Sequence, residues 1–197
     1  MGAEDVDPEL GAITFVVTDL ETTGFTPGLN QIIEVAAVRL RGYEIDAEFS
    51  ALVDPGAEVP WRITEVTGIS TAMVRGERKI EEVLPRYLAF LGEGCFVAHN
   101  VPFDQRFLDY ESARLGYPFA PQSFCTLALA RRFLSDLQSR SLDAVARHLG
   151  IVNRSRHRAL GDAWATSEVL RCFLRQAEAA GIRRRSELLD YWKGSDK

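Results

Sequence analysis

The apolar residues of this chain change from a strand-like to a helical pattern partway along the sequence. The first part contains three strand-like runs, at 13–18, 32–40 and 45–53, and the first of them is β-branched and aromatic, as is typical of a buried strand. Arg-Gly-Tyr at 41–43 separates the second run from the third, and Asp-Pro-Gly at 54–56 ends the third. Because both are turn signals, we expect the chain to begin with antiparallel strands.

The helical part begins near residue 80. Apolar residues between Ile80 and Leu91 recur every three or four positions, which is typical of an amphipathic helix. Further on, short strands are predicted at 95–98 and 123–126, and helices from Pro102 and at 127–134, 141–149 and 162–180. Strands mixed with helices in this order predict an α/β fold, in which helices cover a sheet.

Length and composition favour one folded domain. The chain has 197 residues, of which 46% are hydrophobic and 26% are charged, and a chain of this size can bury a full core. We expect residues 1–10 to form a disordered acidic tail and residues 11–176 to form the domain. Residues 177–197 are predicted to be a charged segment with the pattern of a short amphipathic helix.

Composition also bounds the compartment and the partners. No apolar run approaches the roughly 20 residues that span a bilayer, and the acidic amino-terminus does not resemble a secretory signal. The 3 cysteines form no C-x-x-C pair, which suits reduced thiols. We therefore expect a cytoplasmic protein without membrane contact.

The net charge of -5 argues against a broad basic surface, but bound cations can supply positive charge where a phosphate binds.

Two carboxylates follow the first predicted strand. Asp19 and Glu21 are two positions apart, so the alternation of a strand places both side chains on one face. Such close carboxylates repel each other unless a cation holds them, and Mg²⁺ and Mn²⁺ prefer carboxylate oxygens. An isolated Asp-x-Glu is more often a solvated strand end. Whether this pair indicates a metal site therefore depends on the other acidic residues of the chain.

Two later segments carry similar side chains. Asp104 begins a helix after the sequence His-Asn-Val-Pro-Phe, and Asp162 follows His157 by five positions. Taken singly, each is more often an ordinary acid at a helix start, and His157 a surface histidine. The intervening Ala159 and Gly161 are small and leave room at a crowded helix start. The combination of the three segments is what indicates a site.

Together the three segments resemble the exonuclease motifs of the DnaQ-like DEDDh family of 3′-to-5′ exonucleases. The motifs read Asp-x-Glu-Thr-Thr-Gly at 19–24, His-Asn-x-x-Phe-Asp at 99–104 and His-x-Ala-x-x-Asp at 157–162. The resemblance runs from about Ile13 to Cys172 and is greatest to the epsilon-type, proofreading members. It implies a ribonuclease H-like α/β fold with a mixed five-stranded sheet flanked by helices.

The resemblance also implies a role for each residue of the site. Asp19, Glu21, Asp104 and Asp162 match the family's ligands of two divalent cations, Mg²⁺ or Mn²⁺, and His157 matches its general base. A neutral imidazole suits that role, because it can take a proton from a water acidified by a cation. The expected reaction is hydrolysis of the terminal phosphodiester at the 3′ end, which releases a 5′-mononucleotide.

Further residues match the family's pocket for the terminal nucleotide. They are Thr22, Thr23, Gly24, Val66, Ile69, Asn100 and Phe103. Val66, Ile69 and Phe103 fit a plain core role equally well. Thr67 stands where many relatives carry a histidine that contacts the substrate. Arg154, Arg156 and Arg158 flank the predicted base, where they either neutralise phosphates or are merely solvated.

Three alternatives remain open at this point. The chain is a DNA exonuclease, an RNA-trimming 3′ exoribonuclease, or a non-catalytic module that binds a nucleic-acid end. All five motif positions are filled, which favours catalysis. The expected partner is the 3′ end of a single strand, with DNA favoured over RNA. The epsilon-type resemblance adds a DNA polymerase catalytic subunit as a second partner.

Overall fold

The computed structural model describes residues 7–153 and 155–193, and its centre is a mixed five-stranded sheet. The strands are β1 (Thr14–Thr22), β2 (Ile32–Arg41), β3 (Glu44–Leu52), β4 (Cys95–Ala98) and β5 (Ser123–Cys125), in the spatial order β3-β2-β1-β4-β5. The first three strands pair antiparallel, whereas β4 pairs parallel with β1 and with β5. The predicted α/β fold and its antiparallel beginning are confirmed.

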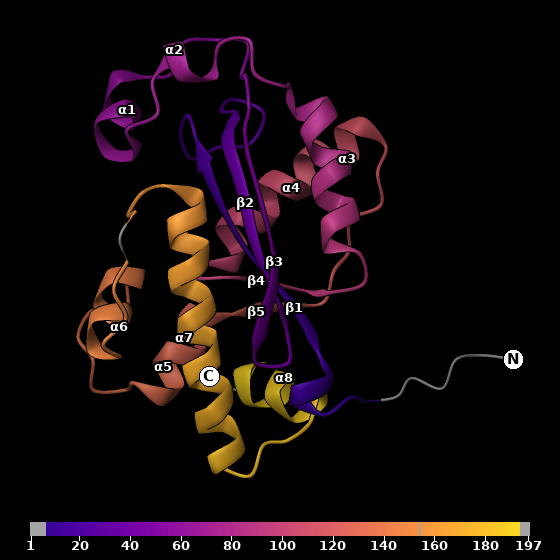
Figure 1. The fold of residues 1–197 in the computed structure, drawn as a ribbon, viewed down its shortest axis with the longest axis vertical. Coiled ribbons are helices and arrows are strands. Elements are labelled where there is room, and N and C mark those ends of the chain that lie inside the picture. The colour runs from indigo at the N-terminus through magenta and orange to yellow at the C-terminus, as the bar shows by residue number, and fades with distance from the viewer. Residues whose placement is uncertain (1–6, 154, 194–197) are drawn as a thin grey trace, which may run out of the picture.

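Helices cover both faces of this sheet (Figure 1). The helices are α1 (Trp61–Thr67), α2 (Thr71–Val74), α3 (Ile80–Leu91), α4 (Val101–Leu115), α5 (Thr126–Phe133), α6 (Leu142–His148), α7 (Ala159–Ala179) and α8 (Arg185–Lys193). The long helix α7 packs on β1 and β2, with α5 and α6 beside it. The helices α3 and α4 pack on the opposite face.

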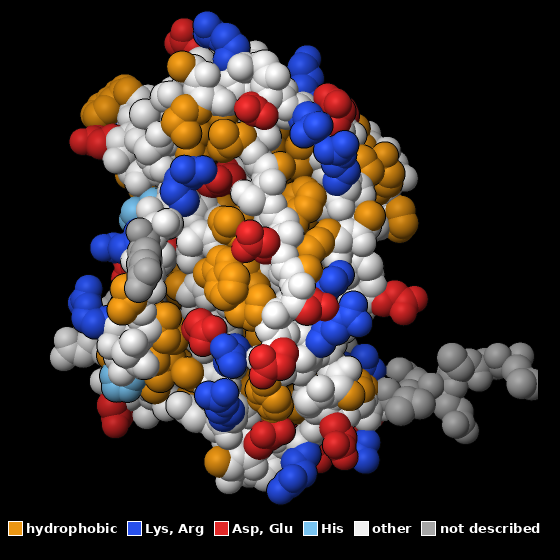
Figure 2. Space-filling model, viewed as in Figure 1, with side chains coloured by type: hydrophobic (Ala, Val, Ile, Leu, Met, Phe, Trp, Pro, Cys, Tyr) orange, Lys and Arg blue, Asp and Glu red, His pale blue; other side chains and the backbone are white. Residues whose placement is uncertain are grey.

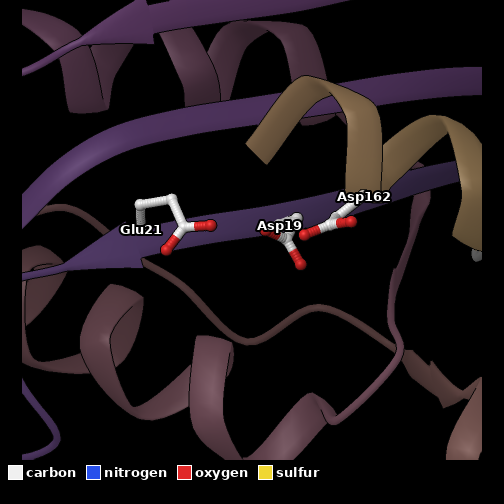
Figure 3. A group of neighbouring side chains, drawn as sticks. All are labelled: Asp19, Glu21 and Asp162. Carbon is white, nitrogen blue, oxygen red and sulfur yellow. The ribbon is translucent and has the colours of Figure 1, made fainter. Parts of the chain in front are cut away.

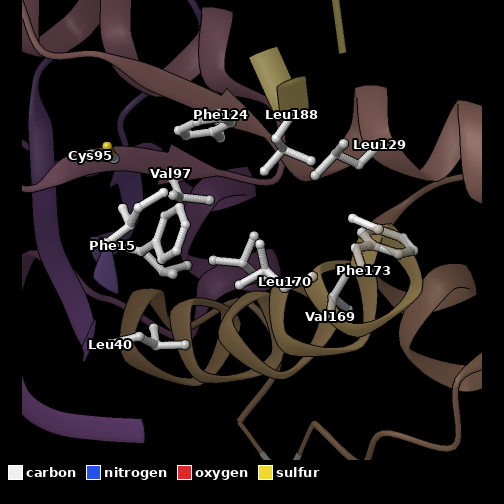
Figure 4. Packing of buried hydrophobic residues seen from close by; sticks show 14 of the residues in the cluster. Phe15, Leu40, Cys95, Val97, Phe124, Leu129, Val169, Leu170, Phe173 and Leu188 are labelled. Atoms are coloured by element: carbon white, nitrogen blue, oxygen red, sulfur yellow. The ribbon is translucent and has the colours of Figure 1, made fainter. Parts of the chain in front are cut away.

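The core has two main parts, one on each face of the sheet. On the α7 face, Phe15 and Leu40 pack against Leu170 and Phe173, as Figure 4 shows. On the other face, side chains of α3 and α4 pack against the alternate residues of β1, such as Val16 and Leu20. Because β1 is buried on both faces, it is a rigid support for the residues at its carboxyl end.

The structure changes several predicted boundaries. The helix predicted from Asp162 begins one turn earlier, at Ala159, and the predicted helix in the last segment is confirmed as α8. The short helices α1 and α2 were not predicted, because four to seven residues show no clear helical period. None of the helices among the described residues has the length and apolar character that crossing a bilayer requires.

The predicted tail at 1–10 is wrong for residues 7–10. Leu10 is fully buried in the core on the α7 face. Its backbone N–H donates to the carbonyl of Arg183, and Asp7 accepts hydrogen bonds from Ser186 at the start of α8. A tertiary contact with the distant carboxyl end therefore orders this segment. Residues 1–6 of the predicted tail lie outside the described residues.

This packing predicts a large effect of Leu10→Ala on stability. We expect the free energy of unfolding to fall by about 2–5 kcal/mol, the usual cost of truncating a buried leucine. Val152→Ala is the control, since Val152 is 78% exposed, and it should change stability by less than about 0.5 kcal/mol. Chemical denaturation followed by circular dichroism measures both. Equal stability of the two variants would contradict the packing of Leu10.

Candidate active site

Three carboxylates meet where the carboxyl end of β1 faces the start of α7. Asp19 and Glu21 project from the same face of β1, and Asp162 projects from the first turn of α7 (Figure 3). One oxygen from each carboxylate lies within 4.8 Å of the others. All three side chains are partly exposed, so a ligand can reach them. This oxygen-only set suits a hard divalent cation.

Asp104 enters the same site from a third element. It lies in the first turn of α4, directly after β4, and its side chain is buried. Its Oδ1 accepts a hydrogen bond of 3.1 Å from the backbone N–H of Leu20, the residue between Asp19 and Glu21. Since β1 and β4 are parallel neighbours, their carboxyl ends place Asp104 beside the strand that carries Asp19.

Burial raises the pKa of every carboxyl in this group, and repulsion from neighbouring carboxylates raises it further at Asp19 and Glu21. Burial raises the pKa of Asp19 well above its usual value, and the charges of Asp104, Asp162 and Glu21 raise it further. Burial, with the charge of Asp162, raises the pKa of Glu21 to about 8. Burial alone raises the pKa of Asp104 to about 7. Ionising all of these groups without a cation is therefore unfavourable.

His157 lies in the loop that leads into α7. Its backbone adopts a positive φ of 57°, which is uncommon for a residue other than glycine. Its N–H donates to Oδ2 of Asp162 at 3.0 Å, and Asn153 Nδ2 donates to Oδ1 of Asp162 at 2.5 Å. Asp162 therefore holds the loop in place, and the His157 side chain is exposed to solvent beside the acidic group.

Close packing at the start of α7 explains the small residues there. A Cβ added to Gly161 would lie 2.2 Å from the carbonyl oxygen of Ser155, and Ala159 is fully buried. The expectation of a crowded helix start is confirmed. Any larger side chain at Gly161 would push the loop that carries His157 away from the helix.

Glu34 is a carboxylate at this site that the motifs did not reveal. It lies on β2, opposite Glu21 of β1, and only 2% of its side chain is exposed. It forms an ion pair with Arg158 at 2.7 Å. Of the predicted phosphate contacts, Arg158 is thus held by Glu34, Arg156 pairs with Asp143, and Arg154 lies outside the described residues. An acid within the apolar run Ile-Ile-Glu-Val at 32–35 was the available sequence signal.

The loop after β1 is held by its own side chains. Thr22 and Thr23 are buried: Thr22 Oγ1 donates to the carbonyl of Gly24, and Thr23 Oγ1 accepts from the N–H of Gln31. A Cβ on Gly24 would lie 2.6 Å from the Asn30 side chain. Both threonines therefore shape the loop through their side chains.

The remaining predicted pocket residues differ in exposure. Asn100 is exposed at the start of α4, and Phe103 is partly exposed with its ring against that of Phe25. Val66 is exposed on α1, whereas Ile69 is fully buried against Ile33, Val59 and Val74. The predicted base contact of Ile69 is wrong, because its side chain belongs to a small core below the α1–α2 segment.

The charge distribution fits binding of an anionic ligand at the carboxylate cluster better than binding along an extended basic surface. Figure 2 shows Lys and Arg side chains scattered among Asp and Glu side chains on one face of the molecule. The net charge is -5. Affinity for an anionic ligand at the carboxylate cluster would therefore depend on cations held there.

Comparison with known families identifies a match over most of the chain. The RNase T model, described as exonuclease, matches residues 16–170. This range contains all four site carboxylates and His157.

Individual relatives agree with this match. The DNA polymerase III subunit epsilon of Aquifex aeolicus is 44% identical over 157 residues, which cover 79% of this chain and 78% of that protein. A PolC-type DNA polymerase III of Thermotoga maritima is 41% identical over 92% of this chain. The chain spans only 13% of the length of that polymerase.

Solved structures share the fold. A structure of exonuclease X in complex with 5′ overhanging duplex DNA has a TM-score of 0.67 and 28% identity, over 83% of this chain and 93% of that one. Exonuclease I of E. coli with a dT13 oligonucleotide has a TM-score of 0.75 over 91% of this chain and 43% of that one. At 20% identity, the second likeness concerns the fold alone.

The raised pKa values predict how stability depends on pH without metal. Glu21 and Asp104 have pKa values of about 8 and 7, above their ordinary values of 4.5 and 3.8. A raised pKa stabilises the fold at low pH, and this contribution is lost as the pH rises through the folded-state value. We expect the Tm in EDTA to fall between about pH 5 and pH 8.

A matched pair of variants assigns this effect to the cluster. Glu21→Gln should show a smaller fall in Tm, whereas Glu65→Gln, at an exposed position on α1, should behave like the unmodified chain. Added Mn²⁺ should reverse the fall at the upper end of the range. The same pH slope in Glu21→Gln as in the unmodified chain would contradict the electrostatic account.

Proposed function

Because this chain belongs to the exonuclease family whose model matches residues 16–170, we propose that it is a metal-dependent 3′-to-5′ exonuclease. Its substrate would be the 3′ end of a single nucleic-acid strand, and its product a 5′-mononucleotide. The observation that carries the proposal is the convergence of Asp19, Glu21, Asp104 and Asp162 from three separate segments. His157 lies beside them on the loop that Asp162 holds.

The four carboxylates would hold two divalent cations, Mg²⁺ or Mn²⁺. The donor set fits hard cations, because only carboxylate oxygens converge and their raised pKa values report uncompensated negative charge. When bound, such cations supply charge neutralisation for the phosphate and lower the pKa of a coordinated water. Asp19, Glu21 and Asp162 form the open part of the site, and Asp104 closes it from the α4 side.

His157 would be the general base. Its side chain is solvent-exposed, and its backbone N–H is fixed on Asp162, which keeps the residue next to the carboxylates. The imidazole would take a proton from the attacking water, whose oxygen forms a new bond to the terminal phosphorus. The bond from phosphorus to the 3′ oxygen of the preceding nucleotide breaks. That oxygen gains a proton and becomes the new 3′-hydroxyl end.

The terminal nucleotide would lie between the loop after β1 and the start of α4. The backbone of residues 22–24 would border this nucleotide on one side, and Asn100 and Phe103, in the exposed or partly exposed start of α4, would border it on the other. The exposed Val66 of α1 would contact a neighbouring base without reading its identity. The hydroxyls of Thr22 and Thr23 would support the loop rather than bind the sugar, since both have partners within it.

DNA is the substrate that we favour, in a proofreading or repair role. Support comes from relatives named as a PolC-type DNA polymerase III and as a DNA polymerase III subunit epsilon, and from the DNA complex of exonuclease X. The same relatives make a DNA polymerase catalytic subunit the proposed protein partner. An RNA-trimming role is the second candidate, because the carboxylates act on phosphates and do not read the 2′-hydroxyl. A cytoplasmic location stays a prediction.

Release of mononucleotides from labelled strands tests this proposal. With Mg²⁺ or Mn²⁺, the chain should shorten a 5′-labelled single strand stepwise, and a strand blocked at its 3′ end should resist. Asp104→Asn keeps the size of the side chain and should lower the rate by at least about 10³-fold, because it removes one carboxylate of the cluster. Asp109→Asn, at an exposed position on the same helix, is the control and should retain the rate.

Matched DNA and RNA strands in the same assay decide the substrate class. Faster turnover of DNA is expected, and faster turnover of RNA would favour the second candidate. Absence of shortening with both metals would leave only a binding role. Full activity of Asp104→Asn would contradict the assignment of Asp104 to the active site.

A further inference from the structure

Glu34 is a buried carboxylate next to the proposed metal site that the proposed chemistry does not use. It lies on β2, the neighbour of the central strand β1, and its cross-strand neighbour on β1 is Glu21. The two side chains therefore project from the same face of the sheet, toward α7. The pairing of β1 and β2 shifts register immediately after Glu21, and such irregularities often re-aim side chains beside functional sites.

Both oxygens of Glu34 are engaged by the residues that directly follow His157. Arg158 Nη2 donates to Oε1 at 2.7 Å, and Arg158 Nε donates to Oε2 at 3.2 Å. The backbone N–H of Ala159, the first residue of α7, donates to Oε2 at 2.8 Å. A bidentate arginine contact fixes direction as well as distance. The acceptor at the helix start also satisfies one of the free N–H groups found there.

These contacts join a rigid strand to the segment that carries two functional residues. His157 precedes Arg158 directly, and Asp162 lies one turn into the helix that Ala159 begins. Asp162 holds this loop to α7, and Arg156 pairs with Asp143 of α6. Glu34 ties the same segment to β2, the neighbour of the strand that carries Asp19 and Glu21.

We infer that Glu34 and Arg158 form a positioning pair, which anchors the segment 157–162 to β2 and thereby sets His157 and Asp162 against Asp19 and Glu21. This inference rests on the proposed function for its catalytic consequence, whereas the anchoring is a property of the protein alone. Arg158 also neutralises Glu34, so the metal site is not faced by a fifth unpaired carboxylate.

The charge balance supports this role. Arg158 Nη2 lies 2.7 Å from a carboxylate oxygen of Glu34, so a positive charge faces this buried negative one. A buried carboxylate that loses its cationic partner is strongly unfavourable. Loss of Arg158 would therefore disturb both the anchor and the electrostatics of the neighbouring ligand.

Hydrogen exchange of the metal-free chain tests the anchoring without any assay of activity. Glu34→Gln keeps the shape of the side chain and removes its charge. Arg158→Met keeps much of the side-chain length and removes the hydrogen-bond donors. In each variant, amides of residues 155–162 should exchange about tenfold faster or more. Amides of α4 should keep their rates, which separates local release from general unfolding. Because the pair acts as one unit, the double variant should exchange no faster than the faster single variant.

Steady-state kinetics tests the catalytic consequence. Glu34→Gln should lower kcat by about 10- to 100-fold with KM changed less than about threefold, as for other residues that orient a ligand through a second contact. Arg158→Lys restores one cationic donor and should recover part of the loss. Asp46→Asn is the matched control, because Asp46 of β3 accepts hydrogen bonds from Arg39 and Arg41, at the opposite end of β2 from Glu34.

The outcomes separate this inference from the proposed function. Unchanged exchange of residues 155–162 in both Glu34→Gln and Arg158→Met would overturn the positioning pair, whatever the activity. Faster exchange in a chain without nuclease activity would support the anchor and contradict the proposed function. If Glu34→Gln does not fold, Arg158→Lys decides the matter, since Arg158 is partly exposed and its milder change should still accelerate exchange.

Discussion

Repulsion among buried carboxylates is the constraint on which the site depends. Asp19, Glu21, Asp104 and Asp162 come from three segments, and burial raises the pKa of each, with repulsion from other carboxylates added at Asp19, Glu21 and Asp162. Nothing in this group attracts its members to one another. The rest of the fold must therefore hold them together, and the stability of the cluster is supplied by the core beneath it.

The sheet provides that support by its topology. The central strand β1 is packed on both faces, so its carboxyl end holds Asp19 and Glu21 with little freedom. The parallel strand β4 ends beside it and leads directly into α4, which carries Asp104. The third contribution is Asp162, which does not follow the end of a strand and lies in the first turn of α7. The helix α7 crosses the sheet, and its start is fastened to β2 by the contacts of Glu34.

Sequence patterns predicted the parts of the site that local geometry determines. Alternation along a strand placed Asp19 and Glu21 on one face, and the small residues around Gly161 indicated a crowded helix start. The features that these patterns missed or left open were decided by tertiary packing. The exposure of Val66 and the burial of Ile69 depend on how α1 and α2 lie against β2, and the order of Leu10 depends on α8. The pair of Glu34 and Arg158 joins residues 124 positions apart, beyond the reach of any local pattern.

The most direct test of the account is a calorimetric titration of the metal-free chain with Mn²⁺. The proposed arrangement predicts about two ions per chain, with proton release because several carboxylates have raised pKa values. His157→Ala should retain this binding, since the imidazole is assigned to the proton and not to the metal. Asp162→Asn should lose one ion or bind at least about tenfold more weakly. Binding of no ion by the unmodified chain, or unchanged binding by Asp162→Asn, would contradict the account.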